Sequence, residues 1–174
     1  MEQLLFDFTE WLRTTPLIDV TFWLNETSLN AWMVTRFWSI PIIQCIHIAA
    51  IAASFSSILM INARMFGFAG SGTMLETSRR YLKVLWWSLL VLVLSGSLMI
   101  VAEPIRELIN PFFWIKMGLL LFAVLFTVAF SRGILLRIGP NDELGAGGKA
   151  SVLLLIVLWI LIMFCGRWIA YAPV

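Results

Sequence analysis

Four long apolar stretches dominate the pattern of hydrophobic and polar positions along this chain. They are expected to cover residues 38–61, 83–102, 111–131 and 150–169. Each comes close to the roughly 20 residues that a helix needs to cross the hydrocarbon core of a bilayer. The third begins with a clear helix signal, because Asn110 suits the N-cap and Pro111 the first helical position. The pattern predicts an all-α fold, an integral membrane four-helix bundle over residues 38–174.

Residues 1–37 are predicted to form an interfacial N-terminal segment in front of the bundle. In the stretch LLFDFTEWL, residues 4–12, apolar side chains gather on one helical face and most charged side chains lie away from it. This pattern is typical of an amphipathic helix that lies in the plane of the membrane interface. Thr14–Pro16 ends this helix, and a second one is expected over residues 27–37. The acidic start argues against a cleavable signal peptide.

Composition supports a membrane protein. Hydrophobic residues make up 61% of the 174 residues and charged residues 13%, whereas soluble domains carry about 25% charged residues. Nine tryptophans suit a protein with much area at membrane interfaces. The net charge of +2 is small, and no basic cluster alternates with aromatic residues in a soluble segment. The expected partner is therefore the lipid bilayer, and nucleic acid is not expected.

Basic residues are divided unevenly between the two sides of the predicted bundle. The loops at 62–83 and 132–149 share a side and hold seven basic residues against three acidic ones. The other side holds five basic residues against seven acidic ones. The excess of Lys and Arg in cytoplasmic loops places both termini on the periplasmic side. The predicted location is the bacterial inner (plasma) membrane, with a multi-pass topology.

The single histidine of the chain, His47, lies inside the first apolar stretch. At 100° per residue, Gln44, His47 and Ser54 fall close to one meridian of the helix and form a thin polar stripe. Such a stripe normally faces the interior of a membrane bundle. Two interpretations remain open. The imidazole ligates haem or a metal ion, or it packs against a neighbouring carbonyl or hydroxyl group.

Three cations are expected near the outer ends of the other helices, on the side towards which His47 lies. They are Arg106, Lys116 and Arg167. Cations above a buried histidine could pair with the carboxylates of haem propionates. Each could equally extend to the interface or pair with Glu103 and Glu107.

A single histidine limits the metal chemistry of one chain. Two axial histidines on one haem cannot come from the same subunit. Three ways to coordinate a haem iron remain. The iron is five-coordinate, or it takes His47 with a methionine such as Met99 or Met60, or it takes a second histidine across a dimer interface. A three-histidine zinc or copper site could form only at a threefold axis. Walker, G-x-S-x-G, H-E-x-x-H and G-x-G-x-x-G motifs are absent, so no catalytic residue is assigned and enzymatic activity stays open.

Three blocks of sequence are similar to a known family. They are HIAAIAASFSSILMINARMFG, AEPIRELINPFFWIKMGLL and GRWIAY. Over residues 38–171 the chain resembles an uncharacterised family of small four-span bacterial inner-membrane proteins, distantly similar to copper-resistance D-type membrane domains. The resemblance implies a four-helix membrane bundle with His47 as a candidate haem or metal ligand. Asn62 stands where an acidic residue is expected before the arginine, and further histidines are missing, which argues against copper transport.

The predicted function is binding of a b-type haem through His47, for electron transfer or redox sensing. The residues predicted to contact the cofactor are His47, Gln44, Ser54, Arg106, Lys116 and Arg167. A homo-oligomer and a redox partner or larger membrane complex are expected. Two alternatives stay open: a protein that binds or transports copper or another small solute through His47, and a non-catalytic accessory subunit of a membrane complex.

Overall fold

The protein is built from helices throughout the part of the chain that the structure describes. The computed structural model describes residues 2–68, 73–134 and 145–172. The helices are α1 (Glu2–Arg13), α2 (Leu17–Asn25), α3 (Ser28–Val34), α4 (Ser39–Met65), α5 (Met74–Ala102), α6 (Pro104–Leu108), α7 (Pro111–Ala129), its π-helical continuation η1 (Phe130–Ile134) and α8 (Ala146–Trp168). The prediction of an all-α fold is confirmed.

Four of these helices are long and apolar enough to cross a membrane. They are α4, α5, α7 with its continuation to Arg132, and α8. Their lengths run from 22 to 29 residues, against about 20 needed to span the hydrocarbon core. The chain therefore has the architecture of a multi-pass membrane protein, as its apolar pattern predicts.

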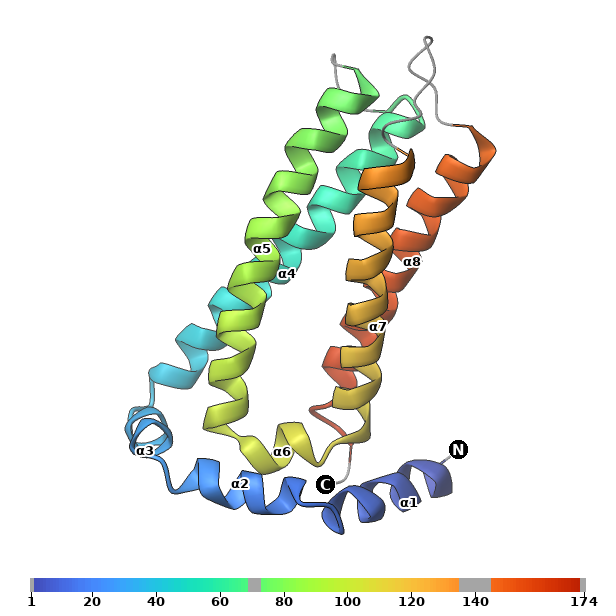
Figure 1. Ribbon diagram of the computed structural model, residues 1–174. Coiled ribbons are helices and arrows are strands. Elements are labelled where there is room, and N and C mark those ends of the chain that lie inside the picture. The colour runs from blue at the N-terminus through green and yellow to red at the C-terminus, as the bar shows by residue number, and fades with distance from the viewer. Residues whose placement is uncertain (1, 69–72, 135–144, 173–174) are drawn as a thin grey trace.

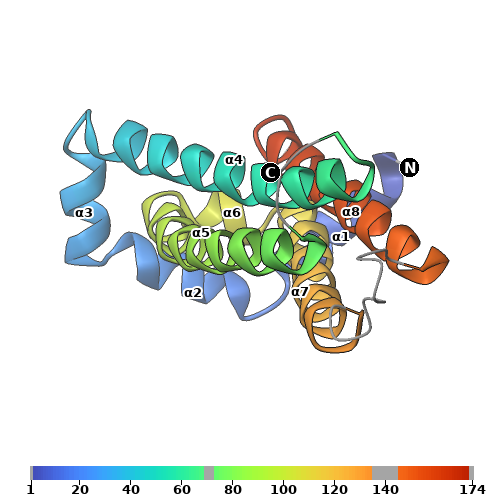
Figure 2. The same ribbon diagram turned by 90° about the horizontal axis from the view of Figure 1, so that it is seen from above.

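The spans are arranged as two antiparallel hairpins. Helix α4 packs along α5, and α7 packs along α8 (Figure 1). Contacts between α4 and α8 join the two hairpins, as the view from above also shows (Figure 2). The main core lies along these contacts and includes Ile58 of α4, Leu85 of α5 and Leu155 of α8, each at most 2% exposed. Most of the remaining apolar surface of the spans faces outward, as expected for helices surrounded by lipid.

Helix boundaries follow from capping groups. Asn110 is the N-cap of α7, because its side-chain oxygen accepts a hydrogen bond from the N–H of Phe112 at 3.0 Å, and Pro111 begins the helix. This confirms the prediction for the third span. Helix α5 begins at Met74 rather than near residue 83, because Thr73 and Glu76 form a capping box in front of it. The first turns of α5 are therefore helical although they are rich in charge.

The N-terminal helices lie across one end of the bundle, the end at which α8 finishes (Figure 1). The predicted helix over residues 4–12 exists as α1, with Leu12 buried against the protein and Trp11 57% exposed. Helix α2, which the hydrophobic pattern did not predict, packs against α6. In α3 the side-chain amide of Asn30 donates to the carbonyl oxygens of Val101 and Ala102, at 2.8 and 3.2 Å. These bonds tie the N-terminal segment to the end of α5.

Candidate functional site

His47 lies where α4 packs against α5, in the half of α4 nearer the N-terminal helices. Its ring nitrogen Nδ1 is 2.8 Å from the hydroxyl oxygen of Ser95 on α5. Ser95 is 4% exposed and His47 is half-buried. The hydrogen bond therefore links two membrane helices through the one histidine of the chain.

The hydroxyl of Ser95 also lies near a backbone carbonyl of its own helix. It donates to the carbonyl oxygen of Val91, one turn back on α5, at 2.6 Å. A hydroxyl group has one proton to donate, so in the tautomer with the proton on Nδ1, His47 donates to the Ser95 oxygen while the hydroxyl donates to Val91. In the neutral imidazole the other nitrogen, Nε2, then carries a lone pair. Among the described residues, no group hydrogen-bonds to Nε2.

Gly96 lies directly beside the imidazole. A Cβ placed on Gly96 would lie 3.5 Å from Cε1 of His47, an ordinary van der Waals distance. Alanine would therefore fit here, whereas a longer side chain would compete with the ring for space. On α5, Ser95 thus holds His47 by a hydrogen bond, and the next residue, Gly96, leaves room for the imidazole ring.

The predicted polar stripe of α4 does face inward, but its members differ in burial. Ser54 is fully buried, and its hydroxyl donates to the carbonyl oxygen of Ala50 at 2.9 Å. Gln44 is half-buried, and its side chain has no hydrogen-bond partner among the described residues. Ser54 is therefore satisfied within its own helix, while Gln44 remains able to hydrogen-bond to a group beside His47.

Lys116 is the predicted cation whose charge acts on His47. It is half-buried on α7, and its charge acts on both His47 and Glu107. Its aliphatic stem runs past Gly166 of α8, where an added Cβ would lie 3.6 Å from the Cδ atom of the lysine. Lys116 therefore lies where α7 meets α8, and its charge acts on His47.

Arg106 and Arg167 are at the same end of the bundle but interact with neighbours on the chain. Arg106 forms a 2.6 Å ion pair with Glu103, and both side chains are exposed. Arg167 donates to the hydroxyl of Tyr171 at 2.6 Å, and its guanidinium lies over the ring of that residue. The predicted convergence of cations is thus clearest for Lys116, whereas the two arginines have local partners.

Glu107 is a buried carboxylate that was expected only as a partner for the cations. Helix α6 turns it inward, so it is 7% exposed. Burial raises the pKa of Glu107, and the positive charges of Lys116 and Arg106 partly oppose that rise. The sequence gives little sign of this burial, because the five-residue helix that causes it lies in a short connection between two spans.

A metal site made only of side chains has little support in the described residues. No group of three or more His, Cys, Asp or Glu side chains comes together among them. Cys45 is two positions from His47 on α4, which places it on nearly the opposite side of the helix, and it is exposed. The cysteine is therefore not part of the environment of the histidine.

No known family, curated protein or solved structure matches this chain. The likeness to small four-span inner-membrane proteins stays a prediction from the sequence blocks. Function must accordingly be argued from His47 and its surroundings.

Proposed function

We propose that this protein binds a b-type haem through Nε2 of His47 and serves electron transfer or redox sensing in the bacterial inner membrane. The observation that supports the proposal is the 2.8 Å contact between Nδ1 of His47 and the Ser95 hydroxyl, which leaves Nε2 of His47 without a hydrogen-bond partner among the described residues. A ligating histidine usually donates its second N–H to an oxygen, which fixes the tautomer and the ring orientation. The free lone pair on Nε2 is what an axial ligand requires.

The donor set favours haem over a bare metal ion. The chain has one histidine, and its described residues supply no group of three or more His, Cys, Asp or Glu donors. Haem supplies its own four ring nitrogens and needs one or two axial ligands from protein. Met99 lies one turn beyond Ser95 on α5 and is a reasonable second ligand. In a homo-oligomer, a second His47 could fill that position instead.

Lys116 is the residue best suited to balance a propionate. It acts electrostatically on His47, and an ammonium group pairs well with a carboxylate. Arg106 and Arg167 would have to leave Glu103 and Tyr171 to contribute. Gln44 would supply a further hydrogen bond to the haem, and Ser54 would form part of the wall of the haem site.

The visible spectrum of detergent-purified protein tests the proposal. After expression with a haem precursor, the parent and Cys45→Ala should show a Soret band, whereas His47→Ala should lose most of it. Cys45 is a matched control because it is exposed on the other side of the same helix. Size-exclusion chromatography of all three proteins checks that each is folded. A parent without a Soret band, or a His47→Ala variant with equal haem content, would refute haem binding.

The same preparations separate the two alternative functions. Elemental analysis should detect copper in the parent and not in His47→Ala if His47 holds a copper ion. An accessory subunit should instead co-purify with larger membrane proteins, and His47→Ala should leave that association intact. A redox partner would also co-purify, but the electron transfer to it would depend on His47.

A further inference from the structure

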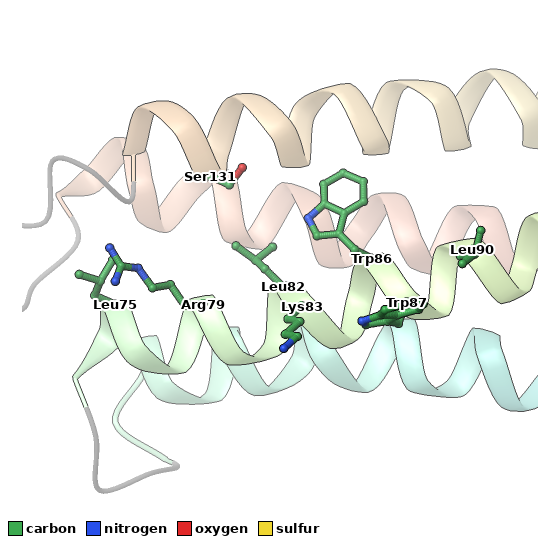
Figure 3. A pocket seen from close by; sticks show the side chains of 8 residues that line it. All are labelled: Leu75, Arg79, Leu82, Lys83, Trp86, Trp87, Leu90 and Ser131. Atoms are coloured by element: carbon green, nitrogen blue, oxygen red, sulfur yellow. The ribbon is translucent and has the colours of Figure 1, made fainter.

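A groove of about 540 Å³ lies beside the first turns of α5, at the end of the bundle away from the N-terminal helices (Figure 3). Its volume is within the range of about 300–1,000 Å³ that is usual for ligand sites. Most of the lining side chains come from α5, and Ser131 in the continuation of α7 faces them. The lining side chains on α5 are Leu75, Arg79, Leu82, Lys83, Trp86, Trp87 and Leu90.

The groove changes from charged to apolar along its length. Arg79 and Lys83 are four positions apart on α5 and so are neighbours on its surface. Trp86 and Leu90 follow further along the helix, with Leu90 roughly 10 Å beyond Lys83 at 1.5 Å per residue. At 29 residues, α5 is roughly 44 Å long, longer than the hydrocarbon core of about 30 Å. Its charged first turns therefore reach the interface, and its apolar turns lie within the bilayer.

The two cations of the groove have no anionic partner among the residues that the structure describes. Arg79 and Lys83 are exposed, and neither forms an ion pair or side-chain hydrogen bond among the described residues. The nearby carboxylate of Glu76 accepts the N–H of Thr73 in the capping box. This arrangement differs from that of Arg106, which is paired with Glu103. An anion at the groove would thus complement charges that the described residues leave unpaired.

We infer that the groove binds an anionic phospholipid from the leaflet at the end of the bundle where α4 ends and α5 begins. The phosphate lies against Arg79 and Lys83, and an acyl chain runs along Trp86 and Leu90. A phospholipid has the same order of charge and apolar surface as the groove, and basic pockets between membrane helices are known to bind anionic headgroups. The inference is independent of haem binding, because it uses neither His47 nor Lys116.

Native mass spectrometry of the full-length protein tests this inference. The protein is released from detergent with equal amounts of phosphatidylglycerol and phosphatidylcholine of the same acyl chains. The parent should retain phosphatidylglycerol at least tenfold better, because each basic residue near an anionic headgroup contributes roughly fivefold. The double variant Arg79→Gln/Lys83→Gln should lose that preference. Arg80→Gln should keep it, since Arg80 is exposed outside the groove, near the ring of Tyr81.

Two further measurements separate a lipid site from a site for phosphate alone. Trp86→Ala should weaken retention of phosphatidylglycerol, and inorganic phosphate should not displace the lipid. Equal retention of the two lipids by the parent, or equal effects of Arg80→Gln and the double variant, would overturn the inference. So would unchanged retention in Trp86→Ala together with displacement by phosphate. If the double variant elutes as an aggregate, Lys83→Gln alone is compared with Arg80→Gln, and Lys83→Gln should show the weaker preference for phosphatidylglycerol.

Discussion

Replacing Ser95 by alanine tests the contact on which the proposed function depends. The hydroxyl oxygen of Ser95 is 2.8 Å from Nδ1 of His47 and 2.6 Å from the carbonyl oxygen of Val91, and Ser95 is 4% exposed. Alanine removes the acceptor and leaves the backbone of α5 unchanged. The imidazole then has no partner on α5 to fix its tautomer or its orientation.

The expected effect on stability is modest and the expected effect on haem affinity is larger. Hydrogen bonds between membrane helices contribute about 0.6 kcal/mol on average and up to about 1.7 kcal/mol. Because the His47–Ser95 bond is short and partly buried, we expect Ser95→Ala to lower the free energy of unfolding by about 1 kcal/mol. Loss of an oxygen that orients a ligating histidine typically weakens the bound metal by about 10–100-fold.

Ser97→Ala is the matched control for this variant. Ser97 is on the same helix and its hydroxyl also donates one turn back, to the carbonyl of Val93 at 2.8 Å, but the residue is exposed. Titration of haem into the apoprotein, followed by Soret absorbance, gives the affinity, and unfolding in mixed detergent micelles gives the stability. If both variants bind haem equally well, Ser95 does not orient a ligand. If Ser95→Ala loses stability alone, His47 is a packing residue.

Two other predictions follow from buried polar groups outside the spans or at their ends. Asn110→Ala should lower the free energy of unfolding by about 2–3 kcal/mol, because Asn110 caps α7 and donates to the carbonyl of Ile169 at 3.1 Å. Asn110→Ser, which keeps only the cap, should recover about half of that loss in the same detergent unfolding assay, and equal stability of the three proteins would contradict the assignment. Burial raises the pKa of Glu107, so the folded state binds its proton more tightly, and stability should fall as pH rises through that raised pKa. Glu107→Gln should remove this dependence of the thermal unfolding midpoint on pH above the ordinary carboxyl range, and an unchanged pH profile would show that the Glu107 carboxyl is not its source.

The architecture could be predicted because its signals are local. A run of apolar residues long enough to span a bilayer identifies a membrane helix without knowledge of its neighbours, and Asn110–Pro111 marks a helix start within two residues. The start of α5 was missed although its signal was present. Thr73 and Glu76 have the spacing of a capping box. The charged residues that follow, up to Lys83, favour a loop by composition, yet they belong to α5. Helix α6 also begins with a proline, Pro104, but its five residues are too few to show a hydrophobic period, and both α2 and α6 are short helices that pack against each other.

The surroundings of His47 could be predicted only in part. The inward direction of its stripe follows from helical periodicity, and Ser54 is indeed buried. The partner Ser95 depends on how α4 and α5 are aligned, which the sequence of either helix alone does not determine. The partners of Arg106 and Arg167 follow from sequence spacing, because residues three or four positions apart are neighbours on a helix. Glu103 precedes Arg106 by three positions, and Tyr171 follows Arg167 by four.

The two proposed sites share α5 and are separated along it, which makes their tests independent. Ser95 and Lys83 are twelve positions apart, roughly 18 Å along the helix. Residues more than about 7–10 Å apart without shared partners usually contribute additively. Arg79→Gln/Lys83→Gln should therefore leave the Soret spectrum unchanged, and Ser95→Ala should leave lipid retention unchanged. A loss of both properties in either variant would instead mean that α5 moves as a unit and that the haem and lipid sites are coupled through it.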